Sequence, residues 1–484
     1  MNTQRMVLLV IILCPSFVFA KTNYLNECRK KQADFRSSSY LQFSFKESTN
    51  RTYHSFKPWQ TYSQPTFGKI WINDNSLLKL DSIKGKTKTS VALIQFDPSA
   101  LLITNFGDTS YNDITKSDYN EYTFESARYS PALLINYFNR TNAKETEESG
   151  NELAVYSTNI TKNIVKLYIR KDNYLAEKVT VLSNDNIYGD VLTTFFYDNY
   201  SVLGNISFPQ FICVKKLNGM VYDTVTYFSS AITHDVPPLV KKPDNYVLKP
   251  DAVDSSDFIT ISKFSDHIHF VSFTRADSKA MVVEFYNFLL VAESPLTSAN
   301  GELLIRAVHE IAPNKPIKYF TYGHWHPWYL GGVRPFIHNG AKIICPECDS
   351  TYIPYLANAK HTLDPDSLSL QPKVLQTEIL RDSMTISDGK YSMKIFLIGK
   401  ESDHTEDYTI FYFPEDKMVF EGDLAWIKKD GAISKPSSRQ VGLYNSIKSR
   451  KLDVVTVVQA WPIKKYGIKS EFRFSEFEEA IKIK

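Results

Sequence analysis

The segment Thr321-Tyr322-Gly323-His324-Trp325-His326-Pro327-Trp328-Tyr329-Leu330-Gly331-Gly332 decides the fold of this chain. Two histidines stand two residues apart, after a mostly apolar run from Pro316 to Phe320 that we expect to be a buried strand. Alternate side chains of an extended segment lie on one side, so both imidazoles can face one point. The two glycines that follow are expected to permit a tight turn into the next helix.

This spacing resembles the metal-binding signature of the metallo-β-lactamase superfamily, H-x-H-x-D-H-x-G-G. The first two histidines and the glycines are in register, whereas Trp328 and Tyr329 occupy the places of the aspartate and the third histidine. The resemblance covers about residues 260–484. It implies an α+β chain with a C-terminal αββα metallo-β-lactamase sandwich, in which half of the usual two-metal site is replaced.

The same resemblance identifies the later positions of the signature. The family places its next metal-binding histidine in a loop after a strand, and His404 matches it. The family's Gly-Asp, whose carboxylate bridges two metals, corresponds to Asp423. The final histidine is replaced by Gln459. The leading strand usually ends in an aspartate, and the nearest carboxylate here is Glu293.

The surviving residues are sufficient for one metal ion. His324, His326 and His404 would form a three-histidine face with an open fourth position, the ligand count of a catalytic zinc site. Zinc in such a site lowers the pKa of bound water to about 7. Asp423 would orient that water or ligate the metal directly. Neither tryptophan nor neutral tyrosine is a good zinc ligand, so we expect one zinc per chain at most.

Two main functions compete. The first is a single-zinc hydrolase acting through metal-bound hydroxide on a small ester, thioester, lactone, amide or phosphoester. In it Trp325, Trp328 and Tyr329 line the pocket mouth, and Tyr329 donates a hydrogen bond to the developing oxyanion. The second is a catalytically inactive binding or scaffold protein that has lost its metal. A weaker third hypothesis is thiol–disulfide chemistry at Cys345 and Cys348, which have C-x-x-C spacing.

Composition limits the partners. The 56 basic and 53 acidic residues leave a net charge of +3, which predicts neither nucleic-acid binding nor a polybasic membrane patch. We therefore expect a small-molecule substrate, with residues 21–235 available for a protein partner. His309, His338 and His361 are expected to be solvated.

The N-terminus has the pattern of a signal peptide. Arg5 precedes a short apolar run, Met6–Cys14, and Val18-Phe19-Ala20 is an acceptable cleavage site. The apolar run is too short for a stable membrane span. We therefore expect cleavage after Ala20 and an exported protein, periplasmic or secreted, in which a bridge between Cys28 and Cys213 is allowed.

The remaining chain divides into three parts by pattern. Residues 21–235 contain recurrent period-two stretches separated by turn clusters, which predict a β-rich antiparallel N-terminal domain, with a long exposed loop at 139–151. Residues 236–258 carry four prolines and predict a linker. From 259 to 484, strand-like and helical runs alternate, in the order that the family resemblance implies for its sandwich.

Overall fold

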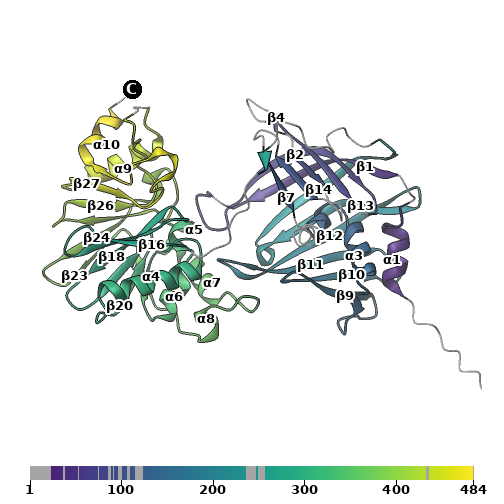
Figure 1. Cartoon of the computed structure of the whole chain (residues 1–484), viewed down its shortest axis with the longest axis horizontal. Helices are drawn as coiled ribbons and strands as arrows, with labels where there is room; N and C mark the ends of the chain where they lie inside the picture. The colour runs from purple at the N-terminus through teal and green to yellow at the C-terminus, as the bar shows by residue number, and fades with distance from the viewer. Residues whose placement is uncertain are drawn as a thin grey trace, which may run out of the picture.

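The structure is a computed structural model. It describes residues 23–482, except for residues 36–38, 53, 75, 85–88, 91, 96–100, 106–109, 115–123, 236–246, 249–256 and 432–434. The predicted signal peptide, residues 1–20, lies outside the described residues, as does most of the predicted linker. Two strand-rich bodies lie side by side, with the earlier residues at the right of Figure 1 and the later residues at the left.

The first body is built on one large sheet of fifteen strands, in the order β15-β7-β6-β5-β3-β2-β1-β14-β13-β12-β11-β10-β9-β8, with β4 paired to β3. All pairs are antiparallel except the parallel pair of β15 with β7. The strands are β1 (Tyr40–Arg51), β2 (Tyr62–Ile72), β3 (Leu77–Lys84), β4 (Thr89–Ser90), β5 (Ala92–Gln95), β6 (Leu101–Asn105), β7 (Ser110–Ile114), β8 (Lys144–Glu145), β9 (Leu153–Ile160), β10 (Asn163–Arg170), β11 (Ala176–Asp185), β12 (Gly189–Leu203), β13 (Ile206–Lys216), β14 (Val221–Thr233) and β15 (Val247–Leu248).

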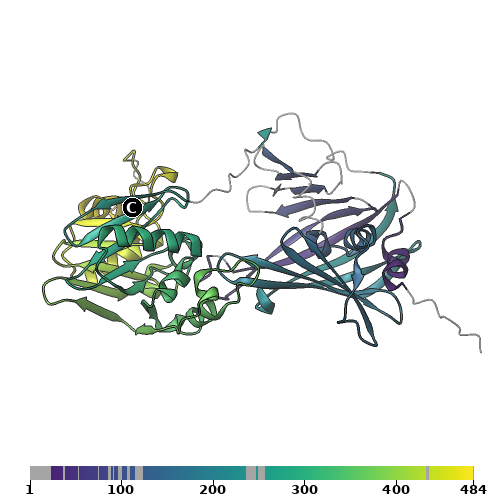
Figure 2. The same ribbon diagram turned by 60° about the horizontal axis from the view of Figure 1, so that its bottom comes forward.

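Three features of this body were not predicted. Helices α1 (Tyr24–Gln32) and α3 (Ala132–Arg140) pack into the apolar core of the curved sheet, as Figure 2 shows. The predicted loop at 139–151 begins inside α3 and contains β8. Two residues of the predicted linker form β15 against β7. These elements are short, so tertiary packing rather than local pattern decides them.

The second body contains two sheets. One has seven strands in sequence order: β16 (Ile259–Lys263), β17 (Ile268–Phe273), β18 (Ser278–Glu284), β19 (Leu289–Ala292), β20 (Ile317–Thr321), β21 (Lys342–Pro346) and β22 (Thr377–Leu380). The other has six, also in sequence order: β23 (Ser383–Ser387), β24 (Ser392–Leu397), β25 (Thr409–Phe413), β26 (Met418–Glu421), β27 (Thr456–Gln459) and β28 (Glu471–Arg473).

Helices cover the outer faces of this pair of sheets. The helices are α4 (Ser298–Ile311), α5 (Pro327–Leu330), α6 (Val333–His338), α7 (Tyr352–Asn358), α8 (Ser367–Leu370), α9 (Ser438–Ser449) and α10 (Phe474–Ile481). Side chains of α4 and α6 join the core of the seven-stranded sheet, and those of α9 and α10 join the core of the six-stranded sheet. Phe270 stacks on Phe420 between the two sheets, with ring centroids 5.7 Å apart. The body is therefore mixed α and β, with its sheets between helices.

The parallel strands determine where functional side chains can gather. Strands β19 to β22 run parallel, and so do β26 and β27. Strand β20 leads directly into the His-x-His segment, while β26 ends beside Asp423 and β27 ends at Gln459. Because parallel strands end at one edge of their sheet, these side chains emerge together.

The paired glycines have a different role from the predicted turn. Neither has a positive φ. Instead, a Cβ at Gly331 would lie 2.5 Å from the Leu296 carbonyl carbon, and one at Gly332 would lie 2.1 Å from Ser294 Oγ. The glycines therefore allow the start of α6 to pack against residues 294–297, directly behind the His-x-His segment.

The chain's four described cysteines are free. Cys28 is buried and donates from Sγ to Gln32 Oε1 at 3.4 Å, so the bridge to Cys213 that the sequence allowed is not formed. Burial raises the pKa of Cys345 to about 12 and also raises that of Cys348, so both thiols are protonated at neutral pH. Because a protonated thiol is a poor nucleophile, these raised pKa values do not favour thiol–disulfide chemistry.

Among the described residues, no helix has the length and apolar character needed to cross a bilayer.

Replacing Gly332 with alanine tests this close packing. We expect Gly332→Ala to lower the free energy of unfolding by about 1–3 kcal/mol, because the added methyl group overpacks the segment behind the histidines. Gly150→Ala is the control, since nothing lies within 4 Å of its Cβ position. Denaturant unfolding followed by tryptophan fluorescence measures both. Equal stability of Gly332→Ala and the parent would contradict the packing role.

Candidate metal centre

Three histidines from two loops converge at the edge of the two sheets. One ring nitrogen each of His324, His326 and His404 lies within 4.8 Å of the others, and all three residues are buried. His324 Nε2 and His326 Nδ1 are 3.0 Å apart. We call this group the three-histidine centre. The three residues predicted from the sequence are thus brought together, although they are separated by up to eighty positions in the chain.

His324 and His326 are held in the neutral form that binds metals. Burial lowers the pKa of His324 well below its ordinary value, and the neighbouring histidines lower it further. Burial and the charge of His404 lower the pKa of His326 to about 3. A neutral imidazole has a free lone pair, so these two residues are available as ligands at neutral pH.

The surroundings of the ring nitrogens test whether a metal fits this centre. Both ring nitrogens of His404 are buried without a hydrogen bond, and His324 Nε2 and His326 Nδ1 face each other. Burying such polar atoms unsatisfied is costly. Zinc bonds of about 2.0–2.1 Å in a tetrahedral site place ligand nitrogens about 3.4 Å apart, close to the spacing of the first two histidines. The residues therefore fit a zinc ion.

Asp423 lies beside the centre. Its Oδ2 is 3.5 Å from His404 Nε2, and its backbone N–H donates to Tyr408 Oη at 2.8 Å. Burial raises the pKa of Asp423, but the close approach of His404 and the charge of His326 outweigh it, so the pKa lies below its ordinary value. Asp423 is therefore a carboxylate. Gly422 lets the rings approach, since a Cβ there would lie 2.7 Å from Tyr408 Oη.

The residues at the second-metal positions are engaged in other contacts. Gln459 accepts hydrogen bonds from the backbone N–H groups of Ala425 and Trp426, at 3.1 and 2.9 Å. Trp328 contacts Trp461 with ring centroids 6.0 Å apart. These two residues hold the surrounding loops together and offer no zinc ligand.

Tyr329 is buried against the centre rather than open to a ligand. Its ring lies over His324, with centroids 4.1 Å apart, and it is 2% exposed. Burial raises its pKa well above the ordinary value, as do the charge of Asp423 and a hydrogen bond to that residue. Trp325 is also buried, at 3% exposed. The mouth-lining positions expected for these two residues are therefore interior.

Two buried carboxyl groups fix the backbone on either side of His324. Glu293 Oε1 accepts from Gly323 N at 3.0 Å, and Asp407 Oδ2 accepts from Trp325 N at 2.5 Å. A Cβ at position 323 would lie 2.7 Å from Glu293 Oε1, so glycine is required for the carboxyl group to reach. Thr409 N then donates to Gly323 O at 2.7 Å, which ties the segment to the second sheet.

Asp407 is itself paired with a second buried carboxyl group, Asp349. The two are hydrogen-bonded to each other, and Tyr322 Oη donates to Asp349 Oδ2 at 2.7 Å. One oxygen of each group is otherwise unpartnered, so a single shared proton satisfies both. Burial raises the pKa of Asp349 to about 6 and that of Asp407 well above its ordinary value.

The first body also contributes a histidine, which sequence reasoning missed. His54, in the connection between β1 and β2, lies edge-on to His326 with ring centroids 5.1 Å apart. No local motif marks it, because it reaches the centre from another sheet. Arg439, the second residue of α9, is half-buried, and its positive charge adds to the effect of burial in lowering the pKa values of both histidines.

The other histidines are distant from this arrangement. His309 is exposed on α4 and His338 bonds to the Gln371 carbonyl, as expected for polar positions. His361, however, is buried, at 5% exposed, which corrects the prediction that it is solvated. It packs under Gly189, where a Cβ would lie 2.6 Å from the imidazole ring.

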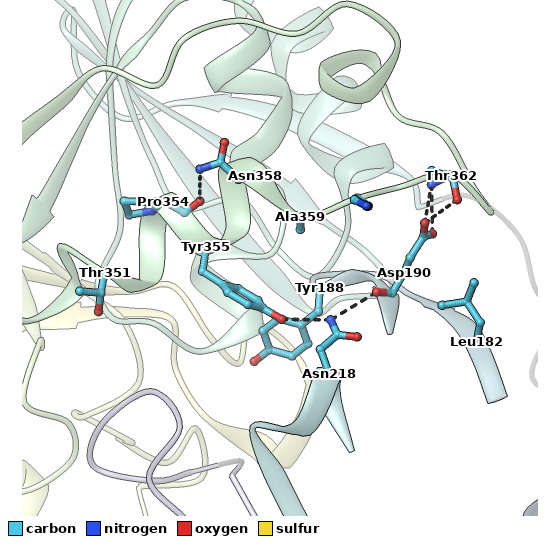
Figure 3. Close-up of a pocket in the computed structure, with 11 residues that line it drawn as sticks. Leu182, Tyr188, Asp190, Asn218, Thr351, Pro354, Tyr355, Asn358, Ala359 and Thr362 are labelled. Carbon is cyan, nitrogen blue, oxygen red and sulfur yellow. Dashed lines mark hydrogen bonds between the residues drawn. The ribbon is translucent and has the colours of Figure 1, made fainter. Parts of the chain in front are cut away.

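A roomy cavity lies elsewhere, between the two bodies (Figure 3). It has a volume of about 760 Å³, and its lining includes Tyr188, Asp190, Asn218, Tyr355 and Thr362. Asp190 accepts from both the backbone N–H and the hydroxyl of Thr362, and Asn218 donates to Tyr355 Oη. These hydrogen bonds pair polar groups of the first body with polar groups of the second.

No family model and no curated protein matches the sequence. Part of the chain is similar to a metallo-β-lactamase from Pontibacter korlensis, at 16% identity and a TM-score of 0.32, over 46% of this chain and 97% of that one. A metallo-β-lactamase from Pseudomonas aeruginosa in its mono-zinc form is similar at 16% identity and a TM-score of 0.34, over 46% and 93%. A sec-alkyl sulfatase double mutant is similar at 12% identity and a TM-score of 0.32, over 46% and 41%.

These TM-scores lie below 0.5, so the fold assignment rests on the sheets and residue positions described above. Two sheets between helices carry His-x-His, the downstream histidine and Gly-Asp at one edge, in the order of the superfamily signature. At the level of the fold, this confirms the resemblance to the metallo-β-lactamase superfamily that the sequence predicted.

The shared proton predicts a pH-dependent stability. A carboxyl group whose pKa is raised in the folded protein does not lower the stability at pH values below its ordinary pKa. The free energy of unfolding falls as the pH rises from the ordinary pKa to the raised pKa of the folded protein. For Asp349 this window runs from 3.8 to about 6. We expect Asp349→Asn to be more stable than the parent at pH 8 by up to about 3 kcal/mol, and equal to it at pH 4.

Denaturant unfolding at both pH values measures this difference. Asp172→Asn, on an exposed turn, is the matched control and should follow the parent at each pH. A constant difference between Asp349→Asn and the parent across the pH range would show that the pair shares no proton.

Proposed function

We propose that this chain is an exported metallo-hydrolase with a single zinc ion, held by His324, His326 and His404 in an αββα sandwich formed by residues 259–484. Its substrate is a small ester, thioester, lactone, amide or phosphoester. The observation that supports this most is the convergence of three buried, neutral or unpartnered imidazoles next to an ionised carboxylate. Residues 21–235 form the N-terminal domain in this proposal, and 236–258 the linker.

The residues around the metal site have separate roles in the proposed reaction. Zinc in a three-histidine site supplies Lewis-acid activation of water and of the substrate's oxygen atom. Asp423 is placed to accept a proton from the attacking water, since its carboxylate faces His404 and stays ionised. Tyr408 and Tyr329 hydrogen-bond to Asp423 and fix its orientation. Tyr329 therefore acts on Asp423 in this proposal, and not on the substrate's oxyanion.

One metal is proposed because the part of the chain that the structure describes contains one group of three metal-ligating side chains. Gln459 and Trp328 hold loops, as described above, and Tyr329 is protonated and buried. The scaffold alternative is not favoured. A site that had lost its metal would gain stability by satisfying or replacing the buried His404, yet neither ring nitrogen of that residue has a hydrogen bond.

His404→Ala tests the proposed zinc site. We expect the parent, purified without chelators, to contain about one zinc per chain, and the variant to lose most of it, because two imidazoles make a much weaker site. His309→Ala, an exposed histidine on α4, should keep the parent's zinc. Elemental mass spectrometry measures the content. A folded parent that refuses added zinc would contradict the proposal.

Asp423→Asn tests the proposed base. We expect kcat to fall by about 10²–10⁴-fold, with zinc content retained, because the amide cannot take the proton. Initial rates with p-nitrophenyl acetate and p-nitrophenyl phosphate serve as probes, with the parent as reference. Loss of zinc along with the rate would instead make Asp423 a fourth metal ligand. An unchanged rate on a substrate that the parent hydrolyses would remove Asp423 from the reaction.

A further inference from the structure

The cavity in Figure 3 is bounded by side chains of both bodies. Leu182, Tyr188 and Asn218 come from the first body, whereas Pro354 and Tyr355 come from α7 in the second. Its volume of about 760 Å³ lies in the range of roughly 300–1,000 Å³ that small-molecule sites in proteins occupy. Such sites occur preferentially between domains. The cavity therefore has the size and the position of a ligand site.

Hydrogen bonds between the two bodies fix the walls of the cavity. The Asp190 carboxylate accepts from Thr362 N at 3.0 Å and from Thr362 Oγ1 at 2.5 Å, and Asp190 N donates to Lys360 O at 2.6 Å. Asn218 Nδ2 donates to Tyr355 Oη at 3.3 Å. Because these bonds join the two bodies directly, the space between the walls exists before any ligand arrives. A preformed site loses less conformational entropy on binding than one that must be assembled.

Two tyrosine rings provide the aromatic part of the lining. Tyr188 and Tyr355 are each partly buried, with ring centroids 6.2 Å apart and ring planes at 67°. Trp59 packs against both rings, at 5.2 and 5.0 Å, and Tyr188 Oη is 3.2 Å from Tyr352 Oη. These contacts hold the rings in one orientation. The face of an aromatic ring carries partial negative charge, which attracts the weakly positive C–H groups of a saturated, oxygen-bearing ring.

Polar groups with remaining hydrogen-bonding capacity also line the cavity. Thr351, Asn358 and Lys360 belong to the lining and are exposed. Asn358 Nδ2 donates to Pro354 O at 2.8 Å, which leaves Asn358 Oδ1 as an acceptor. Within the described part of the chain, neither Thr351 Oγ1 nor Lys360 Nζ has a hydrogen-bond partner. The cavity therefore retains donors and acceptors for the hydroxyl groups of a ligand.

The charges of the lining cancel. Among the described residues that line the cavity, Asp190 is the one acidic residue and Lys360 the one basic residue. The Asp190 carboxylate is occupied by its hydrogen bonds to the second body. The lining thus has no excess charge with which to select an anion or a cation, and a wholly apolar ligand would bury Thr351 and Asn358 without partners. A neutral ligand with several hydroxyl groups satisfies both conditions.

We propose that this cavity binds a neutral carbohydrate, either a monosaccharide or the end of an oligosaccharide. The sugar ring stacks on the tyrosine rings, and its hydroxyl groups bond to Thr351, Asn358 and Lys360. None of the lining residues belongs to the three-histidine centre, so the site is additional to the proposed hydrolase and does not depend on a metal ion. Because both bodies line the cavity, the site also gives residues 21–235 a role in ligand binding.

Saturation-transfer difference NMR on the full chain tests this binding, since it detects weakly bound ligands without an assay of activity. The probes are D-glucose, D-mannose, N-acetyl-D-glucosamine and maltose. We expect at least one of them to bind with a Kd of about 1 mM or tighter, with or without added zinc. No binding of any of these sugars to the folded chain would overturn the proposal, as would binding of benzyl alcohol without binding of any sugar. Neither result bears on zinc content, so the proposed function is tested separately.

Single replacements locate the binding in this cavity. Tyr355→Ala should raise the sugar Kd by about tenfold or more, because it removes an aromatic face, whereas Tyr355→Phe keeps the ring and should stay within about threefold of the parent. Asn358→Ala should raise the Kd by about fivefold, because it removes one uncharged hydrogen bond. Tyr286→Ala is the control, since that tyrosine is 74% exposed and lies outside the lining.

The Asn358→Ala variant keeps the test decisive if Tyr355→Ala fails to fold, because Asn358 is exposed and its side chain is not part of the core. Parent-like sugar affinity in Asn358→Ala would overturn the proposal, as would a loss of affinity in Tyr286→Ala equal to that in Tyr355→Ala.

Discussion

The backbone of residues 323–325 is the constraint on which the site depends. Glu293 and Asp407 hold its two N–H groups, and Thr409 binds the carbonyl between them. Because these three partners come from both sheets, the His-x-His segment cannot shift without separating the layers. The histidines are therefore oriented before any ligand arrives, which is the condition for a high-affinity metal site.

Burial has both a favourable and an unfavourable effect on the three-histidine centre. It keeps His324 and His326 neutral, and it leaves several imidazole nitrogens without partners. It also leads Asp349 and Asp407 to share a proton, so that two carboxyl groups can sit side by side behind the loop. A metal ion would bind one nitrogen of each imidazole and add a positive charge beside Asp423. Folding and metal binding are thus linked through the same few groups.

Part of this could be predicted from the sequence. The apolar run before His324 predicts β20, and the spacing of the two histidines predicts that both imidazoles face one point. Both predictions depend only on neighbouring residues in the sequence. The carboxyl pair Asp349 and Asp407 and the approach of His54 could not be predicted, since each depends on segments that meet only in the folded chain. The two glycines were predicted to permit a tight turn. They instead allow close packing against residues 294–297, which depends on segments distant in the sequence.

X-ray absorption at the zinc edge tests the central claim most directly, because it reports the ligand atoms around the metal in the intact protein. The account predicts one zinc per chain, with nitrogen or oxygen neighbours at about 2.0–2.1 Å and the outer-shell pattern of three imidazoles. That pattern should fall to two imidazoles in His404→Ala. Sulfur neighbours at about 2.3 Å would place the metal at the cysteines instead and contradict the account.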